Sequence, residues 1–150
     1  MPADSWKLRP GLQNVGSFQV SGRPFASGSC LAPATGSASL VVRFPSVTKW
    51  FQIEPLAASQ GHLRVAFSQN GLHGKGGSHF IVHASSSFRG PLDLKISELW
   101  FMSNSATAIT FDIVAGLTNI PTARLDTDDR TLGGTMEAGG PNWSGSVGVG

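Results

Sequence analysis

Apolar and polar residues alternate along most of this chain, and segments rich in glycine, proline, asparagine and serine interrupt the alternation at short intervals. In residues 62–68, for example, Leu63, Val65 and Phe67 would point to one side of an extended chain and their neighbours to the other. A period of two predicts strands with one buried face and argues against amphipathic helices. We therefore expect an all-β protein with almost no helix.

Eight segments show this pattern, the second of them weakly. They are residues 15–22, 24–31, 39–44, 47–54, 62–69, 78–84, 92–102 and 107–115. Short strands at this spacing predict an antiparallel sandwich, with a jelly roll or an immunoglobulin-like topology as the two choices. The single cysteine, Cys30, excludes a disulfide within the chain, and the long segment 92–102 suits a strand that passes between sheets. Both features favour an eight-stranded jelly roll.

Two local signals refine this prediction. In residues 92–102 the apolar phase changes near Ser97 and Glu98, which predicts a β-bulge or a bend where the strand changes sheets. Asn70 and Gly71 end an alternating strand, and both residues tolerate the positive φ that hairpin turns require. We therefore expect a tight hairpin turn at Asn70-Gly71.

The 150 residues are the length of one domain. Residues 1–14 have no apolar period, and residues 122–150 are rich in glycine with few large apolar side chains. We expect residues 15–121 to form the jelly-roll domain, with an extended N-terminal arm at 1–14 and a glycine-rich C-terminal arm at 122–150. Such arms are either disordered or ordered on a neighbouring subunit, and the pattern leaves both alternatives open.

Charged residues make up only 13% of the chain, against about 25% in an ordinary soluble domain. A weakly charged surface suits a protein whose faces are covered by neighbours, although a secreted or phage-type β domain kept soluble by serine and threonine is the alternative. The formal charge of +2 includes no basic run, so nucleic acid is not an expected partner. No stretch approaches the roughly 18 consecutive apolar residues of a membrane span, and the first residues carry no signal-peptide pattern.

The four histidines are His62, His73, His79 and His83. His79 and His83 would share one face of a strand about 13 Å apart, at ~3.3 Å per residue, which is too far for one ion. A metal site would require His62 or His73 to fold over one of them. We expect solvent-facing histidines, with no metal and no other cofactor.

The expected sandwich holds few carboxylates, namely Glu54, Asp93, Glu98 and Asp112, and nothing in their spacing demands a catalytic acid pair. The nucleophile-elbow pattern of hydrolases is also missing from the sequence. We therefore expect that the protein is not an enzyme.

The tryptophans are the interface candidates, namely Trp6, Trp50, Trp100 and Trp143. Trp50 and Trp100 each lie on the strand face opposite to their large apolar neighbours, so both faces of those strands carry apolar groups. Such a pattern favours subunit packing, with ligand platforms and core positions at bends as the alternatives. Trp6 and Trp143 would anchor the two arms on a neighbour.

Four segments of the chain look familiar, namely Val47-Thr48-Lys49-Trp50, residues 63–71, Ala115-Gly116-Leu117-Thr118 and the terminal residues 142–150. They resemble small virion proteins of large double-stranded DNA viruses of protists and algae. The chain is similar to their single jelly-roll penton or minor capsid components over about residues 41–125 and at the extreme C-terminus. This resemblance implies a jelly roll, a homo-pentamer at the icosahedral vertex, contacts with major and minor capsid proteins, and a place in the capsid after synthesis in the host cytoplasm.

Two other functions remain open at this point. A phage head decoration protein would share the structural role, commonly as a trimer. A carbohydrate-binding β-sandwich used for attachment would belong to another class, and selective glycan binding would distinguish it from a vertex protein.

Overall fold

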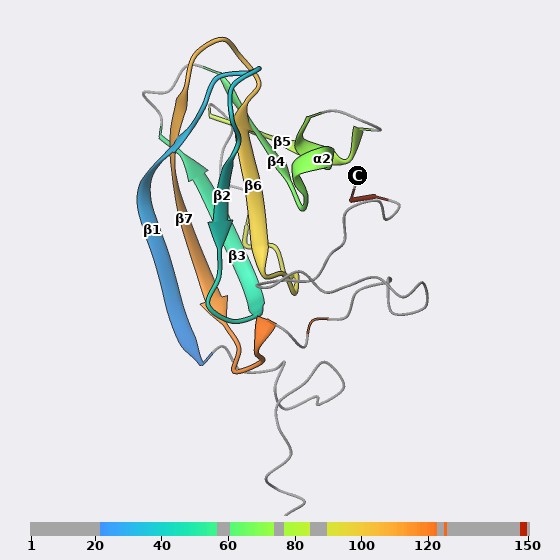
Figure 1. Cartoon of the computed structure of the whole chain (residues 1–150). Helices are drawn as coiled ribbons and strands as arrows, with labels where there is room; N and C mark the ends of the chain where they lie inside the picture. Colours follow the sequence, from blue (N-terminus) through green and yellow to red (C-terminus); the bar gives the residue numbers. More distant parts are fainter. Residues whose placement is uncertain are drawn as a thin grey trace, which may run out of the picture.

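The computed structural model describes residues 22–56, 61–73, 77–84, 90–122, 125 and 148–149. These residues are mostly strand, with one short helix (Figure 1). The elements in chain order are β1 (Arg23–Ala32), β2 (Leu40–Arg43), β3 (Thr48–Pro55), β4 (His62–Ala66), α2 (Gln69–Leu72), β5 (His79–His83), β6 (Glu98–Ser103) and β7 (Ile109–Leu117).

The strands form two antiparallel sheets that pack face to face (Figure 1). One sheet has three strands in the order β1-β7-β3, and the other has four in the order β2-β6-β4-β5. The prediction of an all-β antiparallel sandwich is therefore confirmed. The predicted strand at residues 15–22 and the arm at 1–14 lie outside the described residues, apart from Gly22.

The predicted alternation matches the burial of β7. Ile109, Phe111 and Ile113 are buried in β7, whereas Thr110 and Asp112 between them are only half-buried. The inward rings of Phe111 and of Phe101 on β6 meet across the two sheets, with their centroids 4.4 Å apart. Burying a side chain of this size stabilises the fold by roughly 1.5–3 kcal/mol, so the sandwich is held by contacts between its sheets.

Residues 92–102 do not form the single strand that we predicted. Leu92 makes one bridge to Phe51 of β3 in the three-stranded sheet, whereas β6 begins at Glu98 in the four-stranded sheet. Between them the buried Thr48 hydroxyl donates to Leu94 O at 2.7 Å and accepts from Ile96 N at 3.1 Å. Thr48 N also donates to Ile96 O at 3.0 Å. Thr48 thus holds this segment between the two sheets, and the chain changes sheets just before the predicted phase change.

The prediction of a tight hairpin turn at Asn70-Gly71 is also wrong. β4 ends at Ala66, and Asn70 and Gly71 belong to the helical turn α2. Ser68 caps this turn, because its Oγ accepts a hydrogen bond from Gly71 N at 3.0 Å. Gly71 does not have a positive φ. The strands β4 and β5 still pair in an antiparallel register, but a longer connection joins them.

Candidate functional site

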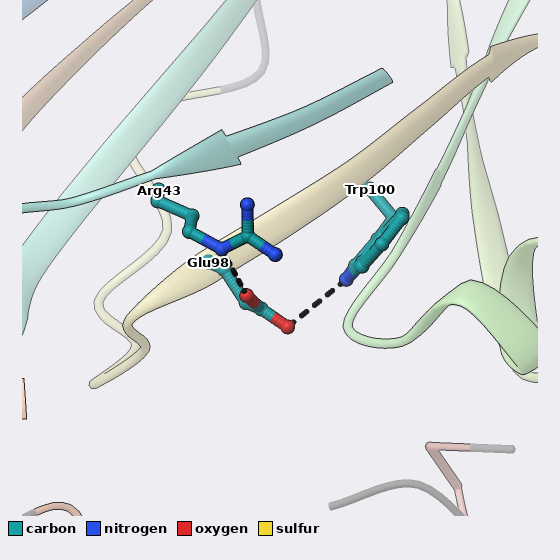
Figure 2. A network of polar contacts seen from close by, with 3 residues as sticks. All are labelled: Arg43, Glu98 and Trp100. Carbon is teal, nitrogen blue, oxygen red and sulfur yellow. Dashed lines mark hydrogen bonds and ion pairs between the residues drawn. The ribbon is translucent and has the colours of Figure 1, made fainter. Parts of the chain in front are cut away.

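Trp100 lies on the outer face of the four-stranded sheet, opposite to the core-facing Leu99 and Phe101. Its Nε1–H donates to Oε1 of Glu98 at 3.1 Å, and Nε of Arg43 on β2 lies 3.3 Å from the other carboxylate oxygen (Figure 2). Arg43 is 61% exposed and Glu98 is 25% exposed, so water screens much of this pair. These contacts hold the indole of Trp100 in one orientation, but they contribute little to the stability of the fold.

The half-buried Trp100 also packs against a small apolar cluster on this outer face, formed by Ala66, Leu72 and Met102. Leu72 belongs to α2, so the helical turn covers part of the sheet from outside. The indole therefore continues a packed cluster and is not an isolated platform.

The other interface candidates are distributed differently. Trp50 lies on β3 in the three-stranded sheet, where it pairs with Gly116 of β7 and is half-buried. The structure therefore places Trp50 and Trp100 on different sheets. Trp6 and Trp143 lie outside the described residues.

The outer face of the three-stranded sheet carries exposed apolar side chains that sequence analysis did not select. Leu31 on β1 is 59% exposed, Leu56 after β3 is 40% exposed, and Val114 on β7 is 36% exposed. Leu31 pairs with Thr110, and Leu56 N donates to Thr110 O at 3.0 Å, so the two leucines flank β7 at the same level. Val114 lies further along the same face of β7, with Asp112 between it and Thr110. We call the three residues Leu31, Leu56 and Val114 together the outer apolar row.

A shallow depression of about 190 Å³ lies on the same face, lined in part by Gly28, Glu54 and Asp112. Glu54 and Asp112 are direct partners in the β3–β7 register, and Asp112 Oδ1 accepts from Ser29 N at 2.7 Å. Ser29 has a positive φ of 55° within the irregularity of β1. The sequence could not identify this carboxylate pair because the register of two distant strands brings it together.

The histidines were expected to face solvent, and the structure brings two of them together. His62 and His83 are partners in the β4–β5 register, and their Nδ1 atoms lie 3.0 Å apart. His79 Nδ1 lies 3.3 Å from Gly71 O, and His73 is exposed at the end of α2. Within the part of the chain that the structure describes, no group of three or more histidine, cysteine or acidic residues could hold a metal ion.

The end of the chain contacts the connection between β4 and α2. Ser68 Oγ donates to Val149 O at 2.6 Å. A Cβ atom on Gly71 would lie 2.3 Å from this same carbonyl oxygen and 2.6 Å from Ser78 O. Glycine is therefore required at position 71 for the approach of two backbone segments.

Comparison with models of known protein families gives no match to this chain, and no curated protein matches its sequence. Across the described ranges, no helix has the length and apolar character needed to cross a membrane. Fold and surface chemistry therefore remain as the basis for assigning a function.

Proposed function

We propose that this chain is a structural component of a virus capsid: a single jelly roll that forms a ring at the capsid vertex and contacts the major capsid protein. In this role the protein acts through its shape and its lateral contacts, without a reacting group.

The order of the strands carries the proposal. If Leu92 counts as a short strand beside β3, the described residues hold eight strands, which can be lettered B to I along the chain. The sheet orders then become B-I-D-G and C-H-E-F. Counted in this way, two sheets of four strands support a jelly roll, a fold that viral capsid proteins use. The resemblance of several segments to virion proteins supports the same class.

Lectin domains also use the jelly roll, so the fold does not decide the function. The outer apolar row favours assembly, because the free energy falls when another protein covers exposed leucine and valine side chains. We assign this row to the contact with the next copy of the chain. A contact between two different surfaces of identical subunits forms a ring when the rotation from one subunit to the next closes after a whole number of subunits, and an open filament when it does not.

Size-exclusion chromatography with light scattering on the purified full-length chain tests this proposal. We expect a species of about 79 kDa, five times the 15.7 kDa of one chain. A trimer would favour the decoration protein. A single chain that selectively binds glycans on an array would overturn the structural role and favour the attachment module.

A further inference from the structure

His62 and His83 form the last pair of the β4–β5 ladder. His62 begins β4 and His83 ends β5, and both residues are exposed. Their ring centroids lie 4.2 Å apart with the planes at 72°, and the two Nδ1 atoms are 3.0 Å apart. The two nitrogens that face each other are the ones that can act as ligands once both carry a lone pair.

The spacing of these nitrogens matches a shared metal ion. Two imidazole nitrogens bound to one tetrahedral Zn²⁺ ion at 2.0–2.1 Å lie roughly 3.3 Å apart. The observed 3.0 Å differs from this value by a few tenths of an ångström, which a small rotation of either exposed side chain supplies. We propose that His62 and His83 chelate one divalent ion of the Zn²⁺, Ni²⁺ or Cu²⁺ class through their Nδ1 atoms, with water at the remaining positions.

The class of metal follows from the ligands. Neutral imidazole suits zinc, copper and nickel, whereas calcium and magnesium require oxygen ligands. No third histidine, cysteine or acidic residue joins the pair among the described residues. A site with two protein ligands leaves open positions and exchanges its ion readily, unlike a closed structural zinc site.

The backbone of His62 is held on both sides. β4 lies between β5 and β6, and the carbonyl of His62 accepts from Asn104 N at 2.8 Å. Arg64 is the next residue on the same face of β4, and its guanidinium donates to Leu72 O and to Asn104 Oδ1. Both acceptors are neutral, so the guanidinium keeps its charge but is held in place by these bonds. His83 is held by the pairing of β5 with β4.

The metal competes with a hydrogen bond. At 3.0 Å, one Nδ1–H can donate to the other Nδ1. On binding, the donor ring transfers that proton to its own Nε2 through solvent, and each Nδ1 then gives its lone pair to the ion. No proton is lost overall, and neither ring has to leave its strand position.

Titration of the untagged full-length chain with ZnCl₂ by isothermal calorimetry tests the site. We expect one ion per chain. His62→Gln and His83→Gln should each weaken binding by about tenfold or more, because loss of an outer hydrogen-bond partner alone costs 10–100-fold in other zinc sites. His73→Gln makes the same chemical change at an exposed position outside the pair, and should leave the affinity unchanged.

Nitrogen NMR of the histidine side chains gives a second readout on the unaltered chain. Zn²⁺ should shift the Nδ1 signals of His62 and His83 and leave those of His79 in place. An absence of binding, a binding affinity that both glutamine variants retain, or shifts confined to other nitrogens would show that the pair is only a hydrogen bond.

Discussion

Phe51 and Leu92 exchange two backbone hydrogen bonds across the edge of the three-stranded sheet. Phe51 N donates to Leu92 O at 3.0 Å, and Leu92 N donates to Phe51 O at 2.8 Å. This single bridge gives β3 a neighbour on its second side, opposite β7. The position of Leu92 therefore decides whether the three-stranded sheet has the fourth strand that the proposed jelly roll needs.

Replacement of Leu92 by proline tests this bridge. Proline removes the N–H that donates to Phe51 O, so we expect the free energy of unfolding to fall by about 1 kcal/mol or more. Urea denaturation measures the change. Leu92→Ala keeps both backbone bonds and loses only a partly exposed side chain, so it should cost less. Equal costs for the two variants would mean that the bridge contributes nothing.

Phe111 should contribute strongly to the stability of the sandwich. It is fully buried and contacts Phe101 across the two sheets. We expect Phe111→Ala to lower the free energy of unfolding by about 3–5 kcal/mol, because it removes a large apolar side chain and leaves a cavity. Val114→Ala on the outer face of the same strand should cost less than about 1 kcal/mol. Similar losses in denaturation experiments would contradict the assignment of the two faces.

The contact between Gly71 and Val149 can be isolated with a double-mutant cycle. Alanine at position 71 would place its Cβ 2.3 Å from Val149 O and 2.6 Å from Ser78 O. Deletion of residues 148–150 relieves only the first clash, so Gly71→Ala should destabilise the shortened chain less than the full chain. We expect a coupling of about 0.5–3 kcal/mol in thermal or urea unfolding.

Gly28→Ala is the matched control for this cycle, because a Cβ there would meet only Asp112 Oδ1 at an ordinary 3.5 Å. Its effect should be the same in both chain lengths. If Gly71→Ala also showed no coupling, the chain end would not rest against α2 in solution.

A charge placed in the outer apolar row should prevent assembly and leave the fold unchanged. Leu31 is 59% exposed, so Leu31→Glu should change the free energy of unfolding by less than about 0.5 kcal/mol. A buried carboxylate at the contact between copies would be costly, so we expect light scattering in solution to show single chains in place of rings. Ala106→Glu adds the same charge on the exposed loop before β7 and should keep the ring. An intact ring in both variants would exclude this row from the contact.

The sequence predicted most of the strands because alternation reports burial directly. In β7 the apolar residues fall on every second position, and the sheet buries those positions. The same rule failed at residues 92–97, where Thr48 supplies hydrogen bonds from another strand. A different rule, the turn signal of Asn70-Gly71, also failed, although Ser68 at a helix N-cap position could have predicted the helical turn.

The surface features were harder to predict because they depend on register between strands. His62 and His83 are 21 residues apart, and the β4–β5 pairing alone makes them neighbours. Glu54 and Asp112 meet in the same way across β3 and β7. Alternation predicted that Trp50 and Trp100 lie opposite to their large apolar neighbours, but it did not show which face is the core or which sheet each tryptophan would occupy.

Cryo-electron microscopy of the purified full-length chain is the most direct test of the proposed role. Our account predicts closed five-fold rings of β-sandwiches in which the outer apolar row of each subunit is covered by the next subunit. Single sandwiches, or rings in which Leu31, Leu56 and Val114 face solvent, would contradict it.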